Sequence, residues 1–320
     1  MLEGGNQDME LRIPKNLLEF EEMYATEEQC QEVLIQMKWP EGFECEKCGG
    51  KNGRWLPNNR RIQCSQCRRQ ASPTSGTLFH GCKLGLKTLF HLIYLVMGEK
   101  DGMNNCALKR QLSINRKTAQ LWSRKIRDEI MHRDLTPLTG VVEVDETTIG
   151  GPAEGCFGRS LGESQSLVVI MVEDDGGKCG RVRLEPSRSA SGEALGRFVQ
   201  KHVVKGSTVR TDGWQAYNEA TSPDYPHVVK IAQKPQDASK ELPLVHRVAS
   251  QLKRFILGTL HGSWDITWLP WLLEEFTFRF NRRKSKQRPL LFNRILEIGK
   301  DRRPPTRRQF KFLYNTLKCA

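Results

Sequence analysis

Asp145 is the residue of this chain whose setting most clearly requires a chemical partner. It lies in residues 140–151, a short run in which three valines favour a β-strand and two glycines end it. A carboxylate in an apolar strand is energetically costly unless something neutralises it. A divalent cation is the natural partner, so this strand predicts a metal ligand.

Two later segments offer further ligands for such a cation. Residues 207–214 form a second β-branched run that contains Asp212 followed by glycine. Residues 245–254 predict a helix with His246 and Lys253 on one face, because seven residues make about two helical turns. A lone Asp-Gly pair is usually only a turn, so the weight of Asp212 depends on its position in the fold.

Other carboxylates near Asp145 are weaker candidates. Strand alternation turns Glu146 to the face opposite Asp145, whereas Glu143 shares the face of Asp145 but lies two residues back. Asp174 and Asp175 lie in a predicted turn, where water solvates them. We therefore expect Asp145 to be the ligand contributed by the first strand.

A second metal site is predicted from four cysteines in two Cys-x-x-Cys pairs. Fifteen residues separate the pairs, which suits two zinc knuckles joined by a β-hairpin and a tetrahedral Zn²⁺ site. So small a module has little apolar core, and the metal would supply its folding energy. Reduced cysteines without a metal, or a redox dithiol, are the alternatives. The four ligands are Cys45, Cys48, Cys64 and Cys67.

The charge of the chain is concentrated in two regions. The net charge is +13 over 320 residues; residues 31–134 carry +10 and residues 281–320 carry +11, whereas residues 135–280 carry only −2. This distribution favours a polyanionic partner such as nucleic acid. The N-terminus is acidic, and no apolar run is long enough for a membrane span, so neither a signal peptide nor a membrane partner is expected.

Residues 104–112 and 116–127 predict two helices separated by a three-residue turn. Their apolar residues share one face, which is typical of a helix-turn-helix that binds double-stranded DNA. The second helix begins with basic residues and carries further polar side chains suited to groove contacts. The predicted DNA-contacting residues are Arg116, Lys117, Gln120 and Arg124 in this helix, together with Arg282 and Arg283, which would hold phosphates.

The elements that must position Asp145, Asp212 and His246 follow one another in a recognisable order. Three consecutive strands are predicted first, then a helix, the strand that contains Asp212, another strand, and helices over residues 243–257 and 268–282. This order is that of a ribonuclease H-like sheet, in which the first and fourth strands are neighbours. Asp145 and Asp212 would then meet at one end of the sheet, where two carboxylates can hold a pair of divalent ions.

The predicted fold class is multidomain α/β, with an N-terminal zinc ribbon and helix-turn-helix followed by a ribonuclease H-like mixed sheet flanked by helices. The expected boundaries are 1–39 for N-terminal helices, 40–80 for the zinc ribbon, 81–134 for the helix-turn-helix domain, 140–285 for the catalytic domain and 286–320 for a basic tail.

Several motifs together resemble a known family. Besides the zinc ribbon and helix-turn-helix, these are Val-Asp145-Glu-Thr-x-x-Gly-Gly, Thr-Asp212-Gly-Trp-x-x-Tyr and Glu-Phe-x-Phe-Arg-Phe-Asn-Arg-Arg. From about residue 20 to 283 the chain resembles bacterial insertion-sequence transposases of the zinc-ribbon DDE group, which is ISXO-like and related to the eukaryotic Merlin elements. The resemblance implies a transposase that binds the terminal inverted repeats of a mobile element and catalyses metal-dependent DNA cleavage and strand transfer.

The resemblance also implies site residues, with one departure from the usual pattern. Asp145 and Asp212 align with the two aspartates of the family, whose third ligand is usually Glu or Asn, seven residues before a lysine. Here Lys253 matches the lysine and His246 occupies the ligand position. Imidazole is softer than carboxylate and favours Mn²⁺ over Mg²⁺. Glu241 and Asp237 are the rival third ligands.

The resemblance implies partners and a location as well. The partners are transposon-end and target DNA and at least one further copy of the chain, and the location is the bacterial cytoplasm at the nucleoid, or the nucleus if the source is eukaryotic. Two other functions stay open at this point. One is a catalytically inactive, transposase-derived DNA-binding regulator, which the histidine favours; the other is a ribonuclease H-like structure-specific nuclease.

Overall fold

The structure is a computed structural model that describes residues 13–57, 60–99, 102–131, 135–150, 165–221, 223–233, 237–260, 266–285 and 290–319. The chain forms two compact units, of which the first contains Met1–Glu129 and Ser285–Arg307 and the second contains Ile130–Lys284 and Arg308–Ala320. Each helix within the described ranges is too short or too polar to span a lipid bilayer.

The first unit begins with two helices, α1 (Leu17–Met23) and α2 (Glu27–Lys38). The side chain of Thr26 accepts the N–H of Gln29, and the side chain of Gln29 accepts the N–H of Thr26. This capping box satisfies two backbone donors that have no partner within the helix, which explains why α2 begins where it does.

An antiparallel three-stranded sheet follows α2, as expected for a zinc ribbon. Its strands are β1 (Gly53–Leu56), β2 (Arg61–Cys64) and β3 (Gln70–Ala71), with β2 in the middle. Ile62 on β2 is buried, but the ribbon has few other apolar residues. Its strands therefore depend on the cysteine cluster beside them rather than on a core of their own.

The predicted helix-turn-helix is present as α4 (Asn105–Leu112) and α5 (Arg116–Met131), which follow the apolar helix α3 (Leu86–Gly98). Asn104 caps α4 by accepting the N–H of Ala107 at 2.8 Å. Ser113 adopts a left-handed conformation with φ of 52°, which ends α4 and turns the chain toward α5. Buried apolar residues at helical spacing hold the two helices together: Leu108, Ile114, Ala119, Trp122 and Ile126.

The segment expected to be a basic tail instead contains two helices, α11 (Leu290–Gly299) and α12 (Arg307–Cys319). Helix α11 packs in the first unit, where the ring of Phe292 lies 5.2 Å from Phe20 and 5.5 Å from Phe90. The carbonyl of Gly299 also accepts the N–H of Leu78 at 2.7 Å. The positive charge of this region suggested a tail, but α11 also carries an apolar stripe. The residues of this stripe are buried: Leu291, Phe292, Ile295 and Leu296.

The second unit is built on a five-stranded mixed sheet with the strand order β6-β5-β4-β7-β8. The strands β4, β5 and β6 form an antiparallel meander, and β7 and β8 run parallel to β4. The first and fourth strands of the domain are thus neighbours, as the predicted order requires. The strands are β4 (Val141–Ile149), β5 (Ser166–Asp174), β6 (Cys179–Ser187), β7 (Thr208–Thr211) and β8 (His227–Val229).

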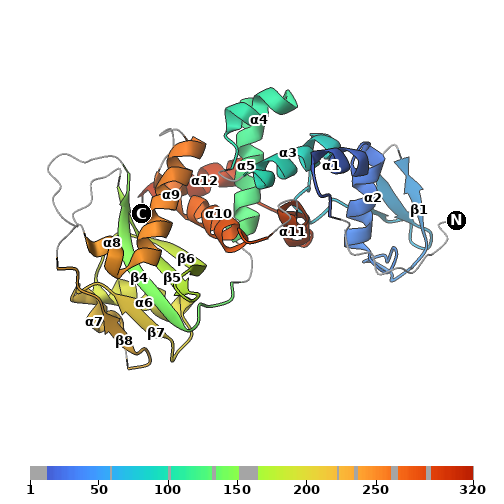
Figure 1. Ribbon diagram of the computed structural model, residues 1–320. Coiled ribbons are helices and arrows are strands. Elements are labelled where there is room, and N and C mark those ends of the chain that lie inside the picture. Colours follow the sequence, from blue (N-terminus) through green and yellow to red (C-terminus); the bar gives the residue numbers. More distant parts are fainter. Residues whose placement is uncertain are drawn as a thin grey trace. The chain divides into compact units, whose positions relative to one another are not determined.

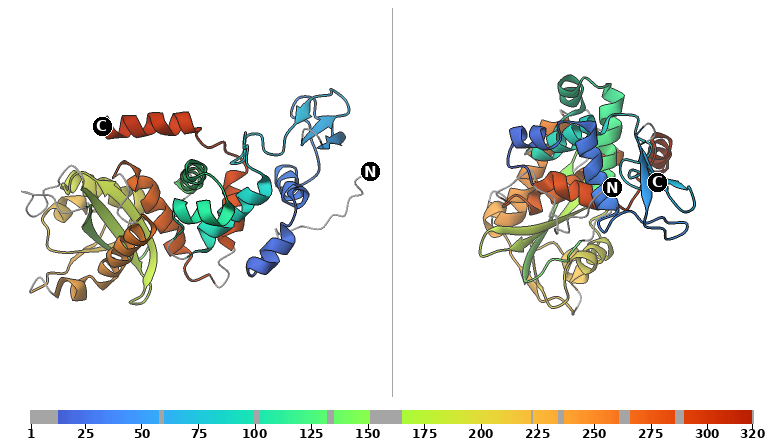
Figure 2. Two further views of the ribbon diagram at one scale, coloured as in Figure 1. Left: turned by 90° about the horizontal axis from the view of Figure 1, so that it is seen from above. Right: turned by 90° about the vertical axis from the view of Figure 1, so that its right-hand side faces the viewer.

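Helices cover both faces of this sheet (Figure 1; Figure 2). One face packs against α9 (Pro243–Leu260) and α10 (Leu269–Asn281), with Val168 and Ile170 in the shared core. The other face packs against α6 (Gly192–His202) and α7 (Ala216–Ala220), with Val142 and Val144 in the core. Strand alternation therefore turns Glu143 and Asp145 toward α9. The short helices α8 (Ala238–Glu241) and η3 (Ile266–Trp268) lead into α9 and α10.

Candidate functional site

The pairing of β4 with β7 gives Asp145 and Asp212 equivalent positions. The parallel register pairs Val142 with Val209 and Glu143 with Arg210. Two residues further along both strands, the same register sets Asp212, just past the end of β7, beside Asp145. Neighbouring strands lie about 4.8 Å apart, and residues at paired positions share a face. Both aspartates therefore belong to the face that α9 covers.

His246 reaches the same place from the first turns of α9. Its Nε2 lies 3.9 Å from Oδ2 of Asp145. The His246 side chain keeps 37% of its surface exposed and the Asp145 side chain 19%, so the pair is open to solvent on one side. An opening of this kind is what a cation and a nucleic-acid substrate both need.

Both aspartates are held by local backbone bonds. Oδ1 of Asp145 accepts the N–H of Glu146 at 2.8 Å, and Oδ1 of Asp212 accepts the N–H of Trp214 at 3.0 Å. Each bond uses one carboxylate oxygen and fixes the rotation of the side chain. The second oxygen of Asp145 is the one that faces His246.

A buried tyrosine lies beside these carboxylates, and the sequence analysis did not single it out. The hydroxyl of Tyr217, on α7, donates to Oε2 of Glu146 at 2.5 Å. The pKa of Tyr217 is raised well above its usual value, first by burial and then by Glu146, Asp145 and Asp212. Both aspartates are thus within electrostatic reach of one phenol. The signal was present in the sequence, because Tyr217 is the last residue of the Thr-Asp-Gly-Trp-x-x-Tyr motif.

The sheet site and the ribbon differ in how tightly their ligands gather. Among the described residues, a group of ligand atoms that all lie within 4.8 Å of one another occurs at the four cysteines and not at the sheet. Asp145, Asp212 and His246 are more widely spread. Their carboxylate oxygens and one imidazole are donors that would suit Mg²⁺ or Mn²⁺.

The four cysteine sulfurs fit a zinc ion. Sγ of Cys45 lies 3.5 Å from Sγ of Cys67, and Sγ of Cys48 lies 3.6 Å from Sγ of Cys64. A tetrahedron with Zn–S bonds of about 2.3 Å has edges of about 3.8 Å, so the spacing agrees. Backbone N–H groups of Lys47 and Cys48 lower the pKa of the Cys45 thiol to about 6, which favours the thiolate that binds metal.

The two zinc knuckles have the same backbone turn. The N–H of Gly49 bonds to the carbonyl of Cys45, and the N–H of Arg68 bonds to the carbonyl of Cys64. Gly49 and Arg68, the residues directly after each Cys-x-x-Cys pair, both have left-handed φ values, 69° and 58°. Repetition of this turn directs both pairs of sulfurs to one point.

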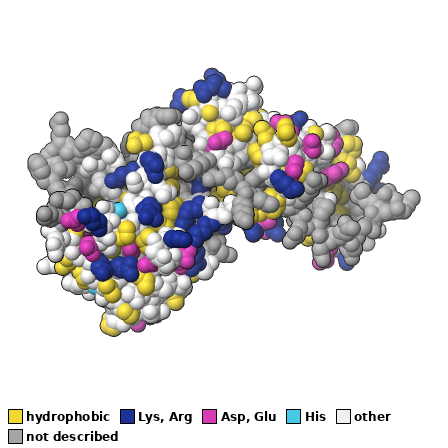
Figure 3. All heavy atoms as spheres, viewed as in Figure 1, with side chains coloured by type: hydrophobic (Ala, Val, Ile, Leu, Met, Phe, Trp, Pro, Cys, Tyr) yellow, Lys and Arg dark blue, Asp and Glu magenta, His cyan; other side chains and the backbone are white. Residues whose placement is uncertain are grey.

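The predicted DNA contacts fall into two groups with different surroundings. At the start of α5, Arg116, Lys117 and Gln120 are exposed, and Arg124 one turn later is half-buried. This arrangement leaves the beginning of the helix available to a DNA groove. On α9, Lys253 is also exposed, two turns beyond His246, and Figure 3 shows Lys and Arg side chains gathered over that part of the second unit.

Arg282 and Arg283 are engaged inside the second unit. The guanidinium of Arg282 stacks on Phe278 at 4.1 Å, and that of Arg283 stacks on Phe280 at 3.9 Å. Arg283 also donates to the carbonyls of Cys179 and Gly180. Arg283 therefore fastens the end of α10 to β6, whereas Arg282 stacks on a residue of α10 itself. Contact of either arginine with phosphates stays a prediction.

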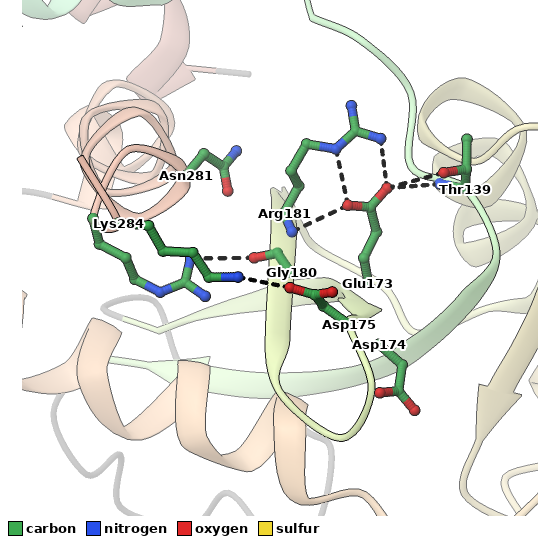
Figure 4. A pocket seen from close by; sticks show the side chains of 9 residues that line it. Thr139, Glu173, Asp174, Asp175, Gly180, Arg181, Asn281 and Lys284 are labelled. Atoms are coloured by element: carbon green, nitrogen blue, oxygen red, sulfur yellow. Dashed lines mark hydrogen bonds and ion pairs between the residues drawn. The ribbon is translucent and has the colours of Figure 1, made fainter. Parts of the chain in front are cut away.

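A cavity of about 330 Å³ lies beside Arg283, at the β5–β6 turn (Figure 4). Four of its charged side chains form two ion pairs, Arg181 with Glu173 and Lys284 with Asp175 at 2.6 Å. Asp174 pairs with Arg210 at 3.2 Å, and Arg283 donates to backbone carbonyls. Asp175, expected to be solvated in a turn, is thus part of an exposed ion pair. Each charged side chain that lines the cavity therefore already has a protein partner.

The rival third ligands differ from His246 in their surroundings. Asp237 forms an ion pair with Lys240 at 2.7 Å, and Glu241 is half-buried at the end of α8. No contact with Asp145 is recorded for either carboxylate within the described part of the chain, whereas His246 has one at 3.9 Å.

Comparison with known proteins agrees with the motifs. Residues 137–281 match the family described as "ISXO2-like transposase domain", and residues 25–70 match "Transposase zinc-ribbon domain". A protein of Halobacterium salinarum, described as "Uncharacterized protein in transposable element ISH50", is 22% identical over 219 residues, which are 63% of this chain and 72% of that protein.

One solved structure is described as "Mos1 transposase paired-end complex with left transposon end". It is 10% identical to this chain, and the match covers 66% of this chain and 79% of that one with a TM-score of 0.22, which is too low to carry an argument. The two family matches carry the assignment. Two segments of the chain therefore match transposase families, one a zinc-ribbon domain and the other an ISXO2-like transposase domain, as the resemblance predicted.

Proposed function

We propose that the protein is a DDE-type transposase whose Asp145, Asp212 and His246 hold two divalent cations for DNA cleavage and strand transfer. The observation that carries the proposal is the meeting of three elements: the parallel register pairs Glu143 with Arg210, two residues before Asp145 and Asp212, and α9 brings His246 within 3.9 Å of Asp145. These ligands face one partly open side of the sheet, where a phosphodiester can approach.

Each ligand has a distinct role. Asp145 and Asp212 present oxygen atoms from neighbouring strands and hold the cations between them. His246 contributes one nitrogen, which shifts the preference toward Mn²⁺. Lys253, on the same face of α9, holds a phosphate of the DNA near the site. The bound cations supply activation of water and neutralisation of the leaving oxygen.

The proposed reaction has two steps at one site. Water attacks a phosphodiester at the transposon end, so that one P–O bond forms, another breaks and a 3′-hydroxyl is released. That hydroxyl then attacks a phosphodiester of the target DNA, and again one P–O bond forms as another breaks. The number of phosphodiester bonds is unchanged in the second step, so strand transfer needs no nucleotide cofactor.

DNA recognition belongs to the first unit in this proposal. The exposed start of α5, with Arg116, Lys117 and Gln120, enters a groove of the terminal inverted repeat, and Arg124 supports it. The zinc ribbon adds phosphate contacts. Two transposon ends must be joined, so the active form is a homodimer or a larger assembly on double-stranded DNA.

A strand-transfer assay with transposon-end DNA tests the proposal. We expect cleavage and joining with Mn²⁺ and with Mg²⁺, and none with Asp145→Asn. Metal-independent DNA binding without any cleavage would instead identify a DNA-binding regulator, which the histidine at the third position favours. Cutting of branched or hybrid DNA that persists after removal of residues 1–134 would identify a structure-specific nuclease.

The third ligand has its own test. His246→Glu replaces imidazole with a hard carboxylate, so we expect the ratio of Mg²⁺-supported to Mn²⁺-supported activity to rise. Glu241→Gln is the control and is expected to leave this ratio unchanged. An unchanged ratio in His246→Glu would remove His246 from the ligand set.

A further inference from the structure

Glu143 is a buried carboxylate that the proposed chemistry does not use. Its side chain has no exposed surface, and it lies on β4 between two valines of the core. A buried charge is costly unless it is paired and hydrogen-bonded. Glu143 meets this condition with partners from two other elements.

Each oxygen of Glu143 bonds to a different element. Oε1 accepts from Nη1 of Arg210, on β7, at 3.2 Å. Oε2 accepts the backbone N–H groups of Leu244 and Val245, in the first turn of α9, at 2.9 and 3.2 Å. One carboxylate therefore joins β4, β7 and α9 directly.

The partners of Glu143 lie next to the proposed ligands. Glu143 is two residues before Asp145, and Arg210 is two residues before Asp212 at the paired position of the register. Leu244 and Val245 directly precede His246. Every link that Glu143 makes is therefore within two residues of a group that is expected to hold a cation.

Helix α9 needs this carboxylate because it lacks a cap of its own. The first N–H groups of a helix have no partner within the helix and are usually satisfied by a Ser, Thr, Asp or Asn side chain directly before it. Here the residue before Pro243 is Leu242, which cannot accept a hydrogen bond with its side chain. Glu143 supplies the acceptor from the sheet, and its negative charge also suits the positive end of the helix dipole.

Arg210 extends the link to a third strand. The same Nη1 that meets Glu143 lies 3.2 Å from Oδ2 of Asp174, at the end of β5. A guanidinium shared by two carboxylates has little freedom to move, so it fixes the side chain of Glu143 in turn.

We propose that Glu143 is a positioning residue that sets the separation of His246 from Asp145 and Asp212, and that it thereby tunes the affinity of the site for Mn²⁺ and Mg²⁺. This inference rests on the proposed function, because it assumes that these three side chains bind cations. Glu143 itself does not touch them. Its effect passes through the first turn of α9 on one side and through Arg210 on the other.

Direct titration with Mn²⁺ tests this inference without relying on catalysis. The zinc-loaded full chain is titrated by calorimetry, and DNA cleavage is measured in parallel as a function of Mn²⁺ concentration. Glu143→Gln keeps an oxygen for the N–H groups of α9 but loses the ion pair with Arg210. We expect its Mn²⁺ affinity to fall about tenfold or more, as is common for residues that orient metal ligands.

Glu173→Gln is the matched control. Glu173 lies on β5 of the same sheet, where it binds Arg181, and none of its recorded bonds reaches β7 or α9. We expect Glu173→Gln to leave the Mn²⁺ affinity unchanged. If the two variants melt at similar temperatures but only Glu143→Gln binds Mn²⁺ weakly, the effect is one of positioning rather than of general stability.

Arg210→Lys keeps the test decisive if Glu143→Gln does not fold. A lysine retains a positive charge beside Glu143 but loses the planar guanidinium whose Nη1 meets both Glu143 and Asp174, so a smaller loss of affinity is expected. The inference is overturned if folded Glu143→Gln, or Arg210→Lys in its place, binds Mn²⁺ like the wild type. If the wild type itself neither binds Mn²⁺ at Asp145 nor cleaves DNA, the proposed function fails together with the inference.

Discussion

The zinc ribbon and the sheet site place metal ligands in opposite ways. In the ribbon, four sulfurs come from two tight turns between Cys45 and Cys67, and they already lie within 4.8 Å of one another. In the sheet, the proposed ligands span Asp145 to His246 and come from three elements, with Nε2 of His246 3.9 Å from Oδ2 of Asp145. A local motif can build its own site, whereas a dispersed one needs a fold to assemble it.

The two regions also differ in what holds them together. The ribbon buries little apolar surface, so its stability depends on the metal. The sheet has an apolar core on both faces, and β5 is buried at every position from Leu167 to Val172. Metal removal should therefore unfold the ribbon and leave the sheet folded, and the predictions below test this contrast.

The largest effect is expected at the ribbon. Cys64→Ser removes one of four zinc ligands, and zinc contributes on the order of 10 kcal/mol to the folding of small zinc modules. We expect loss of bound zinc, loss of hydrogen-exchange protection in β1 to β3, and unchanged protection in β4 to β6. Cys106→Ser, at an exposed free cysteine on α4, is the control. Retention of one zinc ion in Cys64→Ser would contradict the four-cysteine site.

The next effect is expected at Asp145. Asp145→Asn keeps the size of the side chain but removes a negative charge from the sheet site. We expect DNA cleavage to fall by a factor of about 10³ or more, or at least about 4 kcal/mol in the transition state. Zinc content and DNA-end binding should stay at wild-type levels. Equal loss of DNA binding would mean that the two regions are not separable in function.

A smaller effect is expected from a buried carboxylate of the first unit. It tests whether contacts between residues distant in sequence also stabilise that unit. Glu129, at the end of α5, is fully buried and bonds to Arg302 at 3.1 Å, while Arg302 also binds Asp128 at 2.7 Å. Burial raises the pKa of Glu129 from 4.5 to about 7, against the opposing effect of Arg302. Because Glu129 binds its proton more tightly in the folded state than in the unfolded state, protonation stabilises the fold. This stabilisation is full below about pH 4.5 and is lost as the pH rises through about 7.

We therefore expect α5 to be more stable at pH 6 than at pH 8.5, by about 1–2 kcal/mol. Hydrogen exchange of α5 amides measures this difference in a range where the cysteines still hold zinc. Glu129→Gln removes the titrating group and should reduce the difference. If Glu129→Gln keeps the full pH dependence, another group is responsible.

An effect of similar size is expected at the edge of the sheet site. Tyr217→Phe removes the hydroxyl that donates to Glu146, which we expect to cost about 1–2 kcal/mol of stability. Tyr225→Phe is a matched control in the same core, where the hydroxyl donates to the carbonyl of Val203 at 3.3 Å. Thermal unfolding of both variants gives the comparison. An effect no larger than that of Tyr225→Phe would show that the bond to Glu146 contributes little.

Much of the fold was predictable where local rules apply. The spacing of the cysteines, the turn between residues 112 and 116 and the order of strands and helices all agree with the structure. The segment after residue 286 was not predicted, since its positive charge suggested a tail although α11 packs against Phe20 and Phe90. Net charge can be counted from the sequence, whereas the residues against which an apolar helix face packs cannot be identified from it.

The residues alone show which side chains are available: four thiols at knuckle spacing, two aspartates that each follow β-branched residues, and a histidine two turns before a lysine. Covalent geometry and short-range periodicity suffice for these, because each motif is formed by residues close in the chain. Other roles appear only in the folded chain: Glu143, a weak ligand candidate, caps α9 and binds Arg210, and Arg283 donates to the carbonyls of Cys179 and Gly180. Such roles depend on strand register and helix packing, which bring together residues that are up to about a hundred positions apart.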